Sequence, residues 1–237
     1  MNRPSNLVVD RGRVFGEFEP GVYERIAPGH FPVGVVREHE ARYHWAARYV
    51  SGKDVLDVGC GTGYGCQLLA RSGAQHAMGV DIALPALEHG KQSGVEGLVC
   101  ANILQLPFAS STFEVVTCFE VLEHIVEQSA LLEEMKRLLI TGGILILSTP
   151  NRNRTSGDNP YHLKELSLSE LMVLVTKSGL TCIQRSGQHW GLRPSVLRRI
   201  WGIRRAVYSI ENAARVFRAP EIMAEPSVYL LAARKEL

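Results

Sequence analysis

A glycine-rich stretch flanked by acids is the part of the sequence whose residue types and spacing indicate chemistry. The stretch is Asp57-x-Gly59-x-Gly61-x-Gly63, and a second acid, Asp81, ends the next apolar run. Glycines let a ligand approach the backbone closely, and carboxylates accept hydrogen bonds from amino groups and sugar hydroxyls. We therefore expect Asp57 to help hold a cationic amino group and Asp81 to accept hydrogen bonds from both hydroxyls of a ribose.

The spacing of the glycines separates two kinds of nucleotide cofactor. A dinucleotide site places a pyrophosphate on a helix N-terminus through the pattern G-x-G-x-x-G. Tyr64 and Cys66 stand where the third glycine of that pattern would fall. The sequence therefore disfavours a nicotinamide-dependent oxidoreductase, which stays as an alternative class.

Strands and helices are expected to alternate along the chain and to position this loop. The predicted strands cover residues 54–58, 77–81, 97–101, 113–118, 143–148, 181–185 and 227–233, the fifth of them behind a turn at 141–143. The predicted helices cover residues 36–50, 66–71, 84–92, 125–139 and 167–177, and a capping box of Ser167 and Glu170 opens the last one. This alternation predicts a parallel sheet covered on both faces, with ligands outside the carboxyl ends of its strands.

Length and composition fit one large globular domain. The chain has 237 residues, 46% hydrophobic and 21% charged, which excludes a mainly disordered, collagen-like or coiled-coil protein. No uncharged run is long and apolar enough for a membrane span, and no apolar segment follows the charged residues 1–13. We expect a single cytoplasmic domain over 1–237, with an N-terminal lid or tail (1–35), a core (36–186 and 220–237) and a basic helical insertion (187–219).

The net charge of +2 hides a strongly basic segment. Residues 193–218 hold seven arginines and one acid, so that this segment carries +6 and the rest of the chain −4. Apolar residues spaced by three and four predict one or two amphipathic helices there. Their basic face would attract an anionic acceptor, such as a phosphate-linked sugar, or would bring the protein to the periphery of an anionic membrane. The alternative is a packed helix with its arginines in solvent.

The cysteines and histidines give no sign of a disulfide or a metal site. Five cysteines are scattered without a C-x-x-C pair, and the eight histidines lack H-E-x-x-H or any other ligand spacing. We therefore expect no bound metal, and cysteines that act as small buried hydrophobic residues.

Five motifs follow one another over residues 53–151. They are Asp57-Val58-Gly59-Cys60-Gly61-Thr62-Gly63, Gly79-Val80-Asp81, Leu106-Pro107-Phe108, Phe113-Glu114-Val115-Val116 and Val121-Leu122-Glu123-His124. In this order and spacing they resemble the class I S-adenosylmethionine-dependent methyltransferases of type 11. The resemblance implies an α/β fold with a Rossmann-like, seven-stranded, mostly parallel sheet, helices on both faces, an antiparallel last strand and a helical insertion before it. It also implies S-adenosyl-L-methionine as the cofactor.

The resemblance further implies which residues contact this cofactor. The three glycines would line its methionine portion, Asp57 would support the loop and the amino group, and Asp81 would bind the ribose. Asn102 stands where the family commonly has an acid, and its side-chain carbonyl would meet the adenine amino group. The alternative for Asn102 is a residue that only closes a turn.

Four more residues complete the predicted cofactor site. Ile82 and Ile103 directly follow Asp81 and Asn102. Phe119 ends the fourth strand, where the family places residues that face the methyl donor, although it could equally belong to the core. Arg42, on the helix before the glycine loop, could pair with the cofactor carboxylate, with solvent exposure as the alternative.

Methyl transfer from a sulfonium is an in-line displacement on carbon, so the protein mainly positions donor and acceptor and excludes water. A hydroxyl acceptor can require a general base. The candidates are His162 and, second to it, His124, because both follow predicted strands and histidine titrates near neutrality. Capping a helix or bracing a loop is the alternative role for each.

Two shorter motifs, Ser148-Thr149-Pro150-Asn151 and Asn159-Pro160-Tyr161-His162, resemble a subset of the family. Its members O-methylate quinone precursors, glycosylated natural products or cell-surface saccharides, which implies a small-molecule, saccharide or quinone-type acceptor. Basic residues are not interleaved with aromatic ones, so nucleic acid is not expected. A non-catalytic protein that binds the same cofactor is a further alternative, and the oligomeric state is left open.

Overall fold

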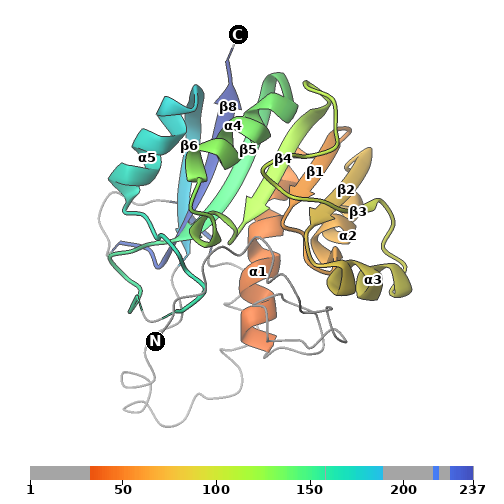
Figure 1. The fold of residues 1–237 in the computed structure, drawn as a ribbon, viewed down its shortest axis with the longest axis horizontal. Coiled ribbons are helices and arrows are strands. Elements are labelled where there is room, and N and C mark those ends of the chain that lie inside the picture. Colours follow the sequence, from red (N-terminus) through yellow and green to blue (C-terminus); the bar gives the residue numbers. More distant parts are fainter. Residues whose placement is uncertain (1–32, 158, 189–215, 219–224, 237) are drawn as a thin grey trace.

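The computed structural model of the chain describes residues 33–157, 159–188, 216–218 and 225–236, which fold around one mixed β-sheet (Figure 1). The strands lie in the order β3-β2-β1-β4-β5-β8-β6-β7. Their bounds are β1 Asp54–Val58, β2 His76–Asp81, β3 Leu98–Cys100, β4 Phe113–Phe119, β5 Leu139–Pro150, β6 Leu180–Gln188, β7 Val216–Arg218 and β8 Val228–Lys235. The strands β1 to β5 pair in parallel, and β8 runs antiparallel to both β5 and β6. The predicted Rossmann-like sheet with an antiparallel last strand is confirmed.

Helices cover both faces of this sheet. Their bounds are α1 Val33–Ala46, α2 Tyr64–Arg71, α3 Leu84–Gln92, α4 Gln128–Leu138 and α5 Leu168–Lys177, with 3-10 turns at Ala47–Tyr49 and Leu122–His124. Side chains alternate along each strand, so neighbours on one strand enter different cores. Leu145 and Leu147 of β5 pack with α4 and α5, whereas Ile144 and Ile146 pack with α1 and α2.

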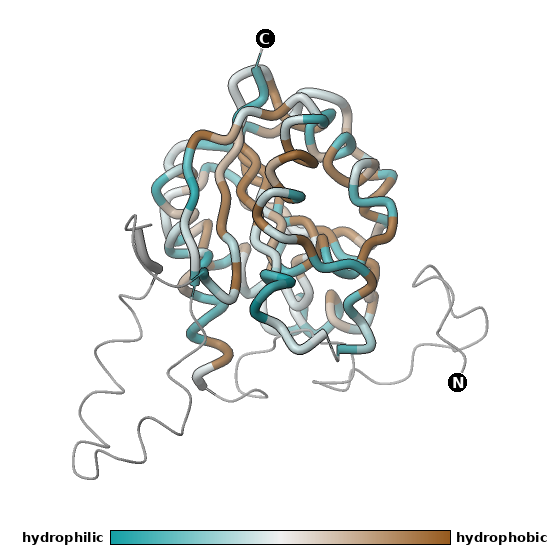
Figure 2. Tube along the Cα trace, turned by 90° about the vertical axis from the view of Figure 1, so that its left-hand side faces the viewer, coloured by the Kyte–Doolittle hydropathy of each residue, from teal (hydrophilic) through white to brown (hydrophobic). Residues whose placement is uncertain are grey.

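The capping box and the apolar spacing that predicted two of these helices are present in the structure. The α5 helix begins with the predicted capping box, in which the Ser167 hydroxyl accepts from the Glu170 backbone N–H and the Glu170 carboxylate accepts from Ser167. The α4 helix buries its apolar stripe and leaves its charged side outside. Figure 2 shows the same division along the chain, with hydrophobic stretches through the middle of the molecule and hydrophilic ones in its loops. Among the described helices, none is long and apolar enough to cross a bilayer.

Two features of the sheet differ from the prediction. Residues 141–143 form no separate turn, because β5 starts at Leu139 and the register between Phe113 and Val115 of β4 shifts opposite them. The predicted helical insertion over 187–219 is wrong at both of its ends. Gly187 and Gln188 extend β6, and Val216–Arg218 form an eighth strand that pairs antiparallel with β6. Local spacing cannot reveal such an edge strand, because its partner is distant in sequence.

Several predictions lie wholly or largely outside the described residues. These include the lid or tail at 1–35, of which only 33–35 are described, as the start of α1, and the arginine-rich helices expected within 193–218. The helical character of the residues between β6 and β7, and the anionic partner of the basic segment, therefore stay predictions.

Candidate active site

The glycine loop joins the end of β1 to the start of α2. Gly59, Gly61 and Gly63 have φ values of 75°, 56° and 73°, which other residues rarely adopt. The backbone N–H groups of Gly59 and Cys60 donate to the carbonyl of Val80 and so tie the loop to β2. The loop therefore lies at the carboxyl ends of β1 and β2, where ligands of open α/β sheets bind.

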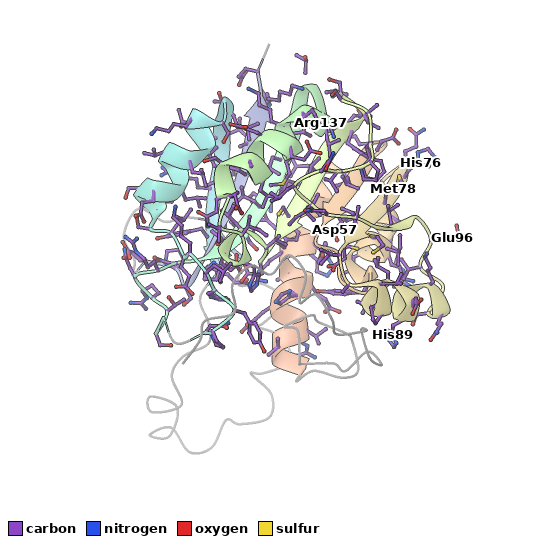
Figure 3. The ribbon with its side chains drawn as sticks, in the orientation of Figure 1. Asp57, His76, Met78, His89, Glu96 and Arg137 are labelled. Atoms are coloured by element: carbon purple, nitrogen blue, oxygen red, sulfur yellow. The ribbon has the colours of Figure 1, made fainter. Side chains whose placement is uncertain are left out.

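Asp57 lies beneath this loop and is 1% exposed. Tyr43 donates its hydroxyl to Oδ2 of Asp57 at 2.9 Å, and Thr117 donates to Oδ1 at 2.6 Å. Burial raises the pKa of Asp57 to about 7, although both donors act in the opposite direction. Figure 3 shows Asp57 near the middle of the molecule. These bonds tie Asp57 to α1 and to β4, and its predicted support of the loop and of an amino group stays a prediction.

Tyr43 is a site residue that the sequence did not single out. Its ring contacts Phe119 and Tyr64 edge to face, with centroids 5.0 and 5.6 Å apart. Gly65 makes this arrangement possible, because a Cβ there would lie 2.1 Å from Cζ of Tyr43. An aromatic residue on the apolar side of α1 was visible in the sequence, but its partner on β1 was not.

Asp81 ends β2 and accepts hydrogen bonds from the glycine loop and from the residue before α3. Its Oδ2 accepts from the Gly61 N–H at 2.9 Å and its Oδ1 from the Ala83 N–H at 2.8 Å. Each carboxylate oxygen has a second lone pair, so Asp81 can also accept from ribose hydroxyls. The neighbouring Ile82 is 41% exposed and offers an apolar surface for a ring.

Asn102 follows β3 and closes a turn. Its side-chain carbonyl accepts from the Leu104 N–H at 2.9 Å, and its backbone carbonyl accepts from Gln105. The side-chain oxygen expected to meet adenine is thus already used once, as the turn interpretation requires. Ile103 packs against the main core. The adenine contact of Asn102 stays a prediction.

Arg42 is buried rather than solvent-exposed, with 2% of its side chain accessible. Its Nε donates to Oε1 of Gln188 at 2.9 Å, and its Nη2 lies 3.5 Å from Oε2 of Glu120. Its Nη1 is buried without a hydrogen-bond partner, as is the hydroxyl of Tyr64. An unpaired buried donor is costly, and a ligand carboxylate would satisfy it. These donors fit the amino-acid end of S-adenosylmethionine.

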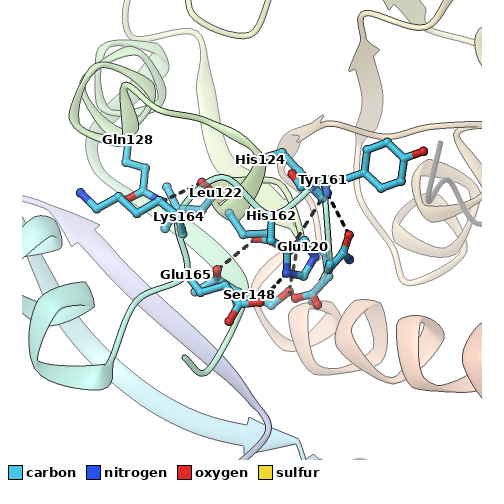
Figure 4. A network of polar contacts seen from close by, with 12 residues as sticks. Glu120, Leu122, His124, Gln128, Ser148, Tyr161, His162, Lys164 and Glu165 are labelled. Carbon is cyan, nitrogen blue, oxygen red and sulfur yellow. Dashed lines mark hydrogen bonds and ion pairs between the residues drawn. The ribbon is translucent and has the colours of Figure 1, made fainter. Parts of the chain in front are cut away.

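The two candidate bases lie together beyond β4 and β5 (Figure 4). The rings of His124 and His162 are 5.1 Å apart at 76°. The Nδ1 atom of His124 contacts the Tyr161 carbonyl at 2.9 Å, and Nδ1 of His162 contacts Oε1 of Glu165 at 2.5 Å. His162 and Glu165 thus form a base and orienting carboxylate, an arrangement suited to proton abstraction.

Two acids between these parts of the site were not in the predicted set. Glu120 has a φ of 53°, and its carboxylate accepts from the Ser148 hydroxyl at 2.6 Å. Glu123 is 1% exposed and accepts from Thr149 at 3.0 Å. Burial, followed by the charge of Glu120, raises the pKa of Glu123 well above its usual value. Phe119 is 7% exposed and belongs to the core, so its contact with the methyl donor is not evident.

The fold is an open α/β domain, and the residues predicted to hold a nucleoside with an amino-acid tail lie around the carboxyl ends of its strands. Residues 56–147 match the family described as methyltransferase domain. A Mycobacterium tuberculosis protein named "Probable S-adenosylmethionine-dependent methyltransferase" is 34% identical over 164 residues, which are 66% of this chain and 59% of that protein. A "Ubiquinone biosynthesis O-methyltransferase" of Psychrobacter arcticus is 36% identical over 115 residues, covering 45% of this chain and 44% of the relative.

Solved structures agree on the fold. A methyltransferase from Archaeoglobus fulgidus, described as SAM dependent, has a TM-score of 0.61 at 19% identity, covering 84% of this chain and 94% of its own. The chain spans less than two thirds of the length of these curated relatives. The match over residues 56–147 and the names of these relatives support the class I S-adenosylmethionine-dependent methyltransferase family that the motifs predicted, with S-adenosyl-L-methionine as its cofactor.

Proposed function

We propose that this chain transfers the methyl group of S-adenosylmethionine to an oxygen of a small-molecule, saccharide or quinone-type acceptor. The observation that carries the proposal is the His162–Glu165 pair, which lies in one polar network with Glu120 and Ser148 (Figure 4). Arg42 contacts Glu120 and so connects the network to the predicted cofactor cradle. A base beside a methyl donor is what a hydroxyl acceptor requires.

The residues of the site would have different roles in such a reaction. S-adenosylmethionine supplies, when bound, a sulfonium methyl that is open to nucleophilic attack. Asp81 binds its ribose and Arg42 its carboxylate, which fixes the donor. His162 accepts the proton of the acceptor hydroxyl, and Glu165 stabilises the resulting imidazolium. The deprotonated acceptor oxygen would then take the methyl group that the cofactor supplies, and the electron pair of the broken carbon–sulfur bond would stay on sulfur.

The nature of the acceptor follows from the surroundings of this pair and from the relatives. Tyr161 and Leu163, which flank His162, are 41% and 39% exposed and offer apolar contacts to a ring or a lipid-linked group. The name of the Psychrobacter arcticus relative indicates a quinone precursor as the acceptor of that protein. We carry over only the chemical class, an acceptor hydroxyl on a small or conjugated molecule.

Label transfer tests this function directly. The purified chain is incubated with methyl-labelled S-adenosylmethionine and with separate pools of phenolic quinone precursors and lipid-linked or nucleotide-linked sugars, and products are separated by mass. A labelled methyl ether that appears only with active protein supports the proposal. Transfer to nitrogen or carbon would overturn the oxygen acceptor, and cofactor binding without transfer to any pool would favour a non-catalytic binding protein.

A further inference from the structure

Three side chains beyond β4 and β5 converge on a single point. Glu123, His124 and His162 each offer one ligand atom, and these atoms all lie within 4.8 Å of one another. The Nε2 atom of His124 is 3.9 Å from Oε1 of Glu123. Two imidazoles and one carboxylate form a ligand set typical of zinc and other divalent transition metals.

The backbone holds these side chains together although His162 is distant in sequence. The N–H groups of Leu163 and Lys164 both donate to the carbonyl of Glu123, at 2.8 and 3.0 Å. The loop after β5 is thereby fixed to the 3-10 turn after β4. Glu123 and His124 are adjacent in that turn, which explains why no regular ligand spacing was visible in the sequence.

Outer contacts orient each of the three side chains. Thr149 donates to Oε2 of Glu123, the Tyr161 carbonyl contacts Nδ1 of His124, and Glu165 contacts Nδ1 of His162. In metal sites the second nitrogen of a ligating histidine almost always contacts a carboxylate or a backbone carbonyl. Both kinds of outer contact are present here.

The burial of Glu123 also favours a cation. Its side chain is 1% exposed, and Thr149 donates a hydrogen bond to it at 3.0 Å. A buried carboxylate is stable when it is paired or when it coordinates a metal.

We infer that Glu123, His124 and His162 bind one divalent transition-metal ion of the zinc class. Ligand atoms on a tetrahedral ion lie about 3.3 Å apart, so a side-chain shift of about 1 Å closes the site. His124 and His162 retain 23% and 14% exposure, so the remaining coordination positions face the accessible side. The earlier expectation of no metal rested on sequence spacing alone.

The bound ion changes how the acceptor is activated, a consequence that rests on the proposed function. An acceptor hydroxyl that coordinates the ion has a lowered pKa and loses its proton more readily. In this form His162 would hold the ion, the ion would fix the acceptor oxygen, and the hydroxyl proton would pass to solvent water before the oxygen attacks the methyl carbon.

Binding of Co²⁺ to the full chain tests the site without any methyl transfer. Co²⁺ in a site with imidazole ligands absorbs visible light, and added Zn²⁺ displaces it. We expect one ion per chain, at least a 100-fold weaker affinity in His162→Gln and Glu123→Gln, and a 10- to 100-fold weaker affinity in Glu165→Gln. His76→Gln is the matched control, because His76 is exposed at the far end of β2 and contacts Asp54 (Figure 3).

The outcomes separate this inference from the proposed function. Weakened binding in the three site variants, with parental binding in His76→Gln and unchanged melting temperatures, supports the site. Equal binding in all variants, or no binding of either ion at 100 µM, overturns it. Label transfer by protein treated with a chelator, at the rate of protein reloaded with Zn²⁺, overturns the activating ion and leaves the methyltransferase proposal intact.

Discussion

Tyr43 on α1 donates its hydroxyl hydrogen bond to the carboxylate of Asp57 on β1, at a distance of 2.9 Å. This bond joins the helix that covers one face of the sheet to the acid beneath the glycine loop. Because both residues are buried, the bond is shielded from water and from salt. The position of the Asp57 side chain therefore depends in part on α1, an element outside the family match at residues 56–147.

Replacement of Tyr43 by phenylalanine is expected to destabilise the protein by about 1–3 kcal/mol, since a buried carboxylate loses one of its two hydroxyl donors. Urea unfolding followed by circular dichroism measures this change. Tyr161→Phe is the control, because Tyr161 is 41% exposed, and its free energy of unfolding should stay within about 0.5 kcal/mol of the parent. Equal stability of the two variants would show that the Tyr43 hydroxyl contributes nothing to Asp57.

Asp57 gives the protein a predictable dependence of stability on pH. Its folded pKa of about 7 lies above the unfolded value near 3.8, so the folded state holds a proton that the unfolded state releases. The contribution of this proton is fully present below pH 3.8 and is lost as the pH rises through 7. The shift corresponds to roughly 4 kcal/mol.

Asp57→Asn removes this titration and should flatten the decline in stability between pH 4 and pH 7. The measurement is the free energy of unfolding at several pH values in the parent and the variant, and the difference between the two curves isolates Asp57 from the other acids. Parallel curves would mean that Asp57 is ionised across the whole range. Asp54→Asn, at the exposed start of β1, is the matched control.

Asp81→Ala is expected to weaken the affinity for S-adenosylhomocysteine, measured by calorimetry, at least 100-fold. The change removes the predicted ribose acceptor and also the acceptor of the Gly61 and Ala83 N–H groups. Asp81→Asn retains one of those acceptors and should lose less affinity. Glu96→Ala, an exposed acid in the loop before β3, serves as the control, and affinity equal to it in Asp81→Ala would sink the assignment.

Arg42→Met tests whether Arg42 binds the amino-acid end of the cofactor or its adenosine end. The variant keeps much of the side-chain length but removes the buried guanidinium, whose Nη1 has no hydrogen-bond partner among the described residues. Affinity for S-adenosylhomocysteine should fall by about 10- to 100-fold, as expected for the loss of a charge-assisted hydrogen bond. Affinity for methylthioadenosine, which lacks the amino acid, should change far less. An equal loss for both ligands would mean that Arg42 acts only by holding Gln188 and Glu120.

Sequence reasoning reached the elements and the glycine loop because both depend on local patterns. The bounds of α3 and α5 were predicted to within a residue, since their apolar spacing and the Ser167 cap act within one helix. Contacts between residues that are distant in sequence could not be predicted in this way. Arg42 meets Gln188, which lies 146 positions away, and no local pattern links the two. The strand β7 and the proximity of His124 to His162 depend on the sheet order in the same way.

His162→Ala is expected to lower the rate of methyl transfer by about 10²- to 10⁴-fold, the usual contribution of a general base, and to leave cofactor affinity unchanged. The second expectation follows because His162 contacts Glu165 and His124 beyond β4 and β5, outside the predicted cofactor cradle. Single-turnover label transfer and calorimetry measure the two quantities on one preparation.

Three further variants sharpen the test. Glu165→Gln keeps the imidazole but removes its carboxylate partner, so its rate should fall between those of the parent and His162→Ala. His124→Ala removes the neighbouring ring and tests the second candidate base, whereas His76→Ala, at the far end of β2, should retain the parental rate. A parental rate in His162→Ala would reduce His162 to a residue that braces the loop after β5. Loss of cofactor affinity together with rate would instead assign it to the cradle.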